Sequence, residues 1–104
     1  MCIRDSLSTI YVDLENNITQ AKVLKTLTSF YQNESFVKIL KPDSLLSTNE
    51  VINTNNCYIS VCKSKYSNKI IILSAIDNLI KGGAGQAVQN LNNKFNFSET
   101  TGLK

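Results

Sequence analysis

Residues 69–90 read KIIILSAIDNLIKGGAGQAVQN, and this stretch decides the fold of the 104-residue chain. Its first part, Lys69–Ile76, is a continuous apolar run, which is typical of a strand with both faces covered. From Ala84 to about Phe95, apolar residues recur at helical spacing. The glycines in between predict a strand-to-helix turn, where the backbone can approach a ligand and free helix N–H groups can receive phosphate or a polar cofactor group.

A second strand is predicted directly before this stretch. Residues 56–63 are rich in β-branched and apolar side chains and are separated from Lys69–Ile76 by a short polar segment, 64–68. Two such runs joined by a polar turn are typical of an antiparallel hairpin.

The first half of the chain predicts a strand, a helix and a short strand. Residues 7–14 favour a strand because β-branched and aromatic residues follow one another. Residues 19–32 repeat apolar side chains every three to four positions, with Thr19 as N-cap, and predict an amphipathic helix. Residues 36–40 form a short strand that Pro42 must end, and residues 41–56 are mostly loop. The whole predicts an α+β fold, with a mixed or antiparallel sheet of about four strands and helices on one face.

Length and charge exclude several classes of protein. A chain of 104 residues with a net charge of +3 is one small domain without the basic stripe of a nucleic-acid binder. No apolar run approaches the ~20 residues of a membrane helix, and no signal-peptide core precedes the first strand. We therefore expect a cytoplasmic protein without nucleic-acid or membrane partners.

Cysteine chemistry is limited by the absence of histidine from the sequence. Three cysteines, Cys2, Cys57 and Cys62, form neither an even disulfide framework nor a zinc site. On one strand Cys57 and Cys62 point to opposite faces. We expect both to be free, buried thiols and expect no metal site.

Three segments carry a resemblance to a known family. The order of residues 77–90, the preceding Ser-Ala-Ile strand end and the tail at 97–103 (FSETTGL) resemble the C-terminal signature of the N-acetyl-gamma-glutamyl-phosphate reductases. The resemblance implies a C-terminal domain of the glyceraldehyde-3-phosphate-dehydrogenase type without its Rossmann domain. It also implies an NADPH-dependent enzyme of arginine biosynthesis that reduces an acyl phosphate to a semialdehyde, and a homo-oligomer at full length.

The resemblance also implies where the cofactor lies. It places the glycine turn beside the nicotinamide end of NADP(H), with Asn78 offering its amide to the nicotinamide. The cofactor-binding residues implied are Asn78, Lys81, Gly82, Gly83, Gly85 and Gln86. Spacing alone favours a plain bend with a solvated Lys81, and we expect Gln89 to be a surface residue.

No catalytic residue is expected in the chain. The family's nucleophilic cysteine and its histidine lie upstream of Leu7, and Cys57 matches a later strand of the family instead, so we expect Cys57 to be structural and the piece alone to be inactive. Residues 1–6 match nothing in the family and predict a non-native leader, whereas residues 7–104 form part of the C-terminal domain, with a final helix that packs on the absent NADP-binding domain. The alternatives are an aspartate-semialdehyde-dehydrogenase-like piece and a free-standing α+β binding or assembly module without catalysis.

Overall fold

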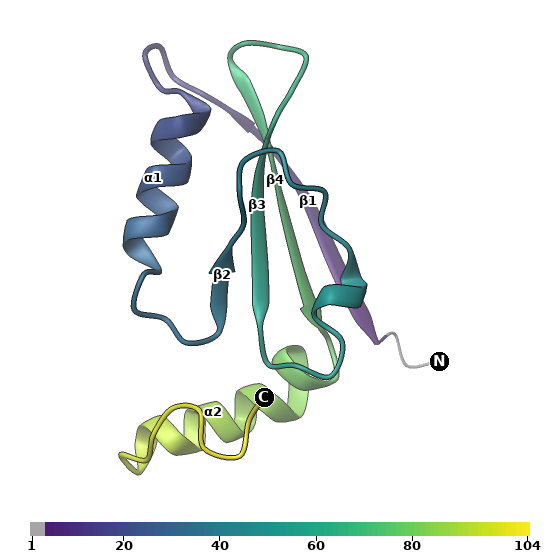
Figure 1. Cartoon of the computed structure of the whole chain (residues 1–104), viewed down its shortest axis with the longest axis vertical. Coiled ribbons are helices and arrows are strands. Elements are labelled where there is room, and N and C mark those ends of the chain that lie inside the picture. The colour runs from purple at the N-terminus through teal and green to yellow at the C-terminus, as the bar shows by residue number, and fades with distance from the viewer. Residues whose placement is uncertain (1–3) are drawn as a thin grey trace.

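The structure is a computed structural model and describes residues 4–104. Cys2 and the first half of the predicted leader lie outside the described residues, whereas Asp5 and Ser6 lie in the first strand. Whether the leader is native stays a prediction. Along these residues the elements, shown in Figure 1, are β1 (Asp5–Asp13), α1 (Gln20–Phe30), β2 (Val37–Ile39), the 3-10 turn η1 (Thr48–Glu50), β3 (Cys57–Lys63), β4 (Lys69–Asp77), the π-helical turn η2 (Ile80–Ala84) and α2 (Gly85–Lys94).

Residues 4–104 form a four-stranded sheet in the order β1-β4-β3-β2. The central strand β4 is antiparallel to both β1 and β3, and β2 is parallel to β3. The central position of β4 agrees with its continuous apolar sequence, but its faces are less covered than predicted, because only Ile70, Ala75 and Asp77 are buried and the rest of the strand is half-buried. The predicted hairpin, the short strand before Pro42 and the mixed sheet are confirmed.

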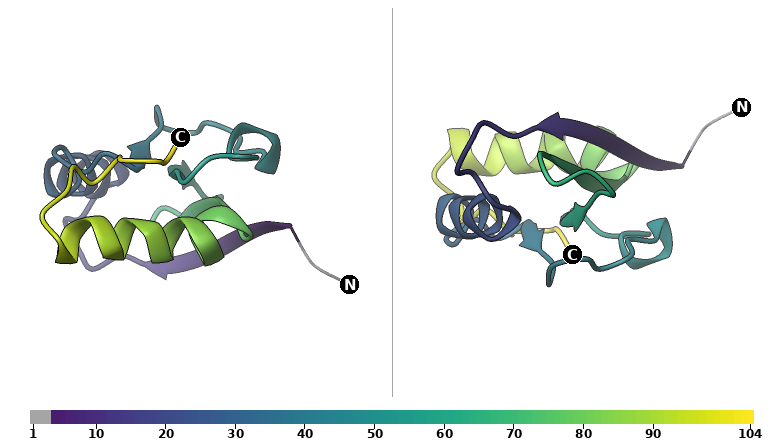
Figure 2. Two further views of the ribbon diagram at one scale, coloured as in Figure 1. Left: turned by 90° about the horizontal axis from the view of Figure 1, so that it is seen from below. Right: turned by 90° about the horizontal axis from the view of Figure 1, so that it is seen from above.

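The first helix begins where the sequence predicts. The side chain of Thr19 accepts a hydrogen bond from the backbone N–H of Lys22 at 3.2 Å, which satisfies one of the free donors of the first turn. The side chain of Gln20 donates to the carbonyl of Val61 at 2.9 Å and so ties the helix to β3. In both views of Figure 2, α1 lies on one side of the strands and the segment that carries η1 lies on the other.

One buried apolar cluster lies under the loop segment. Leu46 and Val51 pack on Ala75 of β4, with half-buried partners at Leu40, Tyr58 and Leu73. The prediction of a loop for residues 41–56 is confirmed apart from η1, but this loop also supplies core residues. Because the loop is rich in Ser, Thr and Asn, its sequence does not indicate that Leu46 and Val51 pack on the sheet.

The last helix lies across the end of the sheet (Figure 1). It starts at Gly85, one residue after the predicted start, and ends at Lys94. Its apolar side chains Val88, Leu91 and Phe95 remain 38%, 50% and 60% exposed. The helix therefore contributes little to the sheet core.

Among residues 4–104, no helix has both the length and the hydropathy to cross a membrane.

Candidate functional site

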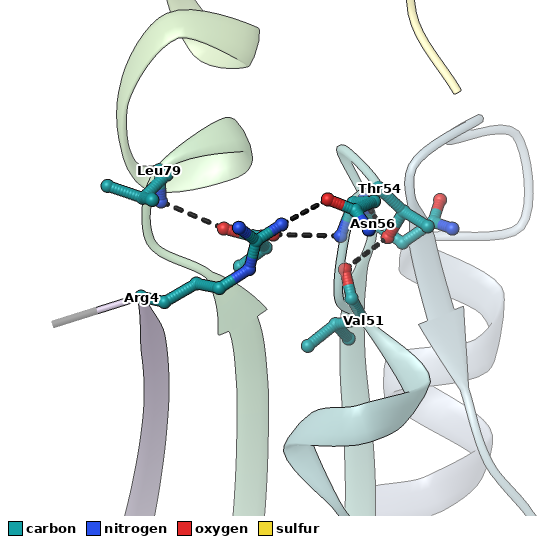
Figure 3. A network of polar contacts seen from close by, with 7 residues as sticks. Arg4, Val51, Thr54, Asn56 and Leu79 are labelled. Carbon is teal, nitrogen blue, oxygen red and sulfur yellow. Dashed lines mark hydrogen bonds and ion pairs between the residues drawn. The ribbon is translucent and has the colours of Figure 1, made fainter.

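The glycine turn is anchored by Asp77, the last residue of β4. Its carboxylate is fully buried and accepts hydrogen bonds from the backbone N–H groups of Asn53 at 2.8 Å and Leu79 at 2.9 Å. The guanidinium of Arg4 lies 3.2 Å away, and Figure 3 shows it reaching from the start of β1 toward the loop that carries Val51 and Thr54. An aspartate that binds the N–H group two residues later starts a turn, so Asp77 sets the direction in which the chain leaves the sheet.

These contacts also set the charge of Asp77. Burial raises the pKa of the carboxyl, but the N–H groups of Asn53, Leu79 and Ile80 and the positive charge of Arg4 favour the carboxylate, and the net pKa lies below its ordinary value. The site therefore holds a buried carboxylate whose negative charge is stabilised by backbone N–H groups and by Arg4.

The glycines of the turn have different surroundings. A side chain at Gly85 would meet the carbonyl oxygen of Ile80 at 2.7 Å and the amide of Asn55, so this position needs glycine for packing. Gly82 lies against the side-chain oxygen of Asn78, and Gly83 lies beside the Asn78 carbonyl, where an added carbon would sit at 3.3 Å. Gly82 and Gly83 are exposed and Gly85 is buried, and at Gly82 the space that a side chain would take is filled by the Asn78 side-chain oxygen.

Lys81 is half-buried and held by side-chain contacts, whereas spacing alone favoured a solvated lysine. Its ammonium donates to the side-chain oxygen of Gln89 at 2.8 Å and lies 5.6 Å from the centroid of the Phe36 ring. Gln86 donates to Asn90 one turn later in the same helix, at 2.9 Å. The aromatic face and the amide hold Lys81 in one place because each interacts favourably with a cation.

The six residues predicted to bind the cofactor thus lie on one continuous turn. Asn78, Gly82 and Gly83 are exposed, Lys81 and Gln86 are half-buried, and Gly85 is buried. A hollow of about 310 Å³ adjoins the turn and is lined by Asn53, Ile80, Ala84, Gly85, Val88, Gly102, Leu103 and Lys104. Of the six residues only Gly85 lines this hollow, whereas Asn78, Gly82 and Gly83 are exposed outside its lining.

Comparison with known proteins places the chain. Residues 2–78 match the family described as semialdehyde dehydrogenase, dimerisation domain. The chain belongs to this family. Its α+β fold with a mixed sheet is the predicted fold class.

Several curated relatives of this semialdehyde dehydrogenase domain carry the same name. The N-acetyl-gamma-glutamyl-phosphate reductase of Thermoanaerobacter pseudethanolicus is 45% identical over 96% of the chain, and that of Desulforamulus reducens is 48% identical over 97%. The same-named protein of Staphylococcus aureus strain MRSA252 is 44% identical over 97%. In each case the match covers 29% of the relative, so the chain spans less than a third of these proteins. The resemblance to this family of reductases is confirmed.

Sequence reasoning missed a buried polar row on α2 of this domain. Gly85, Gln89 and Asn92 are buried at spacings of four and three residues, so they share one side of the helix. The expectation that Gln89 is a surface residue is wrong, because its side chain is only 8% exposed. A glycine one turn before Gln89 was the available signal, since it marks the side of the helix that another segment approaches closely.

The cysteines of the domain lie in the sheet. Cys57 and Cys62 are both free and half-buried, and their register partners, Ile76 and Ile71, put them on opposite faces as predicted. The sulfur of Cys57 lies 3.5 Å from the hydroxyl of Ser74. Residues 4–104 contain no cluster of three or more side chains of the types that bind metals.

Proposed function

We propose that the chain is the C-terminal part of an NADPH-dependent N-acetyl-gamma-glutamyl-phosphate reductase, which forms N-acetylglutamate semialdehyde in arginine biosynthesis. The observation that carries the proposal is the 42–48% identity to proteins of that name over nearly the whole chain. Amino-acid identity at this level over a continuous domain supports a shared reaction because it includes the turn as well as the core.

The glycine turn is the proposed contact with the nicotinamide end of NADP(H). The amide of Asn78 is exposed and has donors and an acceptor, which suit a carboxamide. The exposed backbone at Gly83, where an added carbon would sit 3.3 Å from the Asn78 carbonyl, is the proposed point of approach for the cofactor. The cofactor supplies hydride when bound, and the residues of this chain bind and orient it.

The reacting groups are proposed to come from the part of the enzyme outside this chain. Displacement of phosphate from an acyl phosphate needs a thiolate with an acid–base partner. The sequence has no histidine, and Cys57 contacts Ser74 within the sheet, so Cys57 is proposed to be structural. The isolated chain is therefore expected to lack reductase activity.

The remaining surfaces are proposed to join the parts of the longer enzyme. The exposed apolar side of α2, with Val88, Leu91 and Phe95, suits a helix that packs on a dinucleotide-binding domain. The sheet of a dimerisation domain suits association of two subunits. A cytoplasmic location stays a prediction from the sequence.

The test uses a chimera in which residues 1–104 replace the matching 29% of the Thermoanaerobacter pseudethanolicus relative. Asn78→Ala should raise the Michaelis constant for NADP(H) roughly tenfold, because a lost hydrogen bond to a buried cofactor costs about 1 to 3 kcal/mol. Asn93→Ala, which removes an exposed amide from α2, is the matched control and should leave that constant unchanged. Lower thermal stability without any change in cofactor use would show that Asn78 only shapes the turn. A chimera without reductase activity, alongside an active parent enzyme, would contradict the function itself.

A further inference from the structure

One buried amide connects three separate segments of the domain. The side-chain oxygen of Gln89 accepts hydrogen bonds from the Asn55 amide and from the Lys81 ammonium, each at 2.8 Å. Its nitrogen donates to the Glu99 carboxylate, also at 2.8 Å. Gln89 thus joins the residues before β3, the glycine turn and the C-terminal tail.

The tail is held by the same group of side chains. Asn92, which is 2% exposed, donates to the carbonyl of Glu99 at 3.1 Å and to that of Thr101 at 2.9 Å. The backbone N–H of Asn55 donates to the carbonyl of Lys104 at 2.8 Å. The segment Glu99–Lys104 is therefore held to α2 at its beginning and middle and to Asn55 at its end.

The geometry restricts how Gln89 can be oriented. With its oxygen toward Lys81 and Asn55 and its nitrogen toward Glu99, every neighbour meets an opposite partner. The reversed amide would direct its nitrogen at the Lys81 ammonium and its oxygen at the Glu99 carboxylate, and a buried polar group without a partner costs free energy. Glu99 therefore fixes the orientation of Gln89, and Gln89 fixes the position of the Lys81 ammonium beside Phe36.

We propose that Gln89 is a positioning residue for the glycine turn, and that the tail Glu99–Lys104 is the strap that fixes Gln89. Through Lys81, the strap holds the exposed backbone of Gly82 and Gly83 in the form that receives the cofactor. The consequence for cofactor use rests on the proposed function of the turn, whereas the strap itself does not.

An exchange of the two partners tests the strap. Gln89→Glu keeps acceptors for Lys81 and Asn55 but removes the donor and places a second carboxylate against Glu99, so the strap should open. Adding Glu99→Gln places the donor amide at position 99, opposite the carboxylate introduced at position 89. The hydrogen bond between the two positions, and with it the strap, should then form again. Asn93→Asp, which introduces the same charge at an exposed position on the same helix, is the matched control.

The first measurement is hydrogen exchange of the Asn55 amide, whose acceptor is the Lys104 carbonyl. Gln89→Glu should speed its exchange about tenfold or more, as expected for the loss of a charged hydrogen bond, and the double variant should return it to the original rate. Equal exchange in the original chain and in Gln89→Glu would overturn the strap. If the single variant does not fold, Glu99→Gln alone, which removes only the charge, should speed the exchange by a smaller factor, and no change would again overturn the strap.

The second measurement is steady-state kinetics in the chimera. Gln89→Glu should raise the Michaelis constant for NADP(H) severalfold with little change in kcat, and the double variant should restore it. An opened strap with an unchanged Michaelis constant would overturn the positioning role. An effect of Gln89→Glu together with none of Asn78→Ala would instead remove Asn78 from the cofactor contact and leave the strap intact.

Discussion

The carboxylate of Asp77 accepts the backbone N–H of Asn53 at 2.8 Å, although the two residues are 24 positions apart. The same carboxylate holds the N–H of Leu79, so one buried side chain fixes the loop before β3 and the turn after β4. The close-up in Figure 3 shows the two segments on opposite sides of this contact. The Asp77 carboxylate therefore determines the shape of the site together with the glycines.

Asp77→Asn should lower the free energy of unfolding by about 1 to 3 kcal/mol, because an amide must direct a donor at one of two backbone N–H groups. Urea denaturation measures the change. Asp13→Asn is the control, since Asp13 pairs with Lys69 at the exposed surface and such pairs contribute about 0 to 1 kcal/mol. Equal losses in the two variants would show that the buried contacts of Asp77 add nothing.

The stability of the domain should depend on pH through Asp77. Its pKa is lowered in the folded protein, so its contribution is complete above the unfolded value of 3.8 and is lost as the pH falls through the folded value. Denaturation midpoints measured from pH 6 downward should therefore decrease most steeply below about pH 4. Asp77→Asn should flatten part of that decrease, and an unchanged slope would contradict the assignment.

Gly85→Ala should destabilise the domain by about 1 to 3 kcal/mol, as overpacking does, because the new carbon meets the Ile80 carbonyl at 2.7 Å. Ala84→Gly is the control: it removes a methyl group at the neighbouring exposed position and should lower the free energy of unfolding by about 1 kcal/mol or less. Thermal denaturation of the two variants compares them. A harmless Gly85→Ala would mean that α2 can move away from Ile80.

Cys57→Ser should lower the free energy of unfolding by about 1 kcal/mol, since the hydroxyl can still bond to Ser74 while apolar contact is lost. Turnover of the chimera should stay largely unchanged. Cys62→Ser, on the opposite face, is the control for a thiol-to-hydroxyl change in the same strand. Loss of several orders of magnitude in turnover with the fold preserved would make Cys57 the nucleophile.

The sequence predicted the elements of this fold because their signals are local. The continuous apolar run of β4, the helical spacing after Thr19 and the polar turn between β3 and β4 each lie within one short window. The family resemblance, too, rested on contiguous residues. These features need no knowledge of distant partners.

The polar contacts of the site could not be predicted in the same way. Gln89 is buried because Asn55, Lys81 and Glu99 meet around it, and these partners are 34, 8 and 10 positions away. Gly85, one turn earlier, marks a close approach on this side of the helix, but it does not tell which residues approach. For the same reason the loop that holds Leu46 and Val51 looked like solvent-exposed chain.

The pairing of β1 with β4 has a consequence for synthesis. The nearest paired residues, Asp13 and Lys69, are 56 positions apart, whereas β3 and β4 are joined by a short hairpin. Closing the longer loop costs more chain entropy before any contact is gained. During synthesis on a ribosome, β1 therefore emerges before its partner β4. Until β4 follows, the backbone N–H and C=O groups of β1 are unpaired and accessible to chaperones or to other nascent chains.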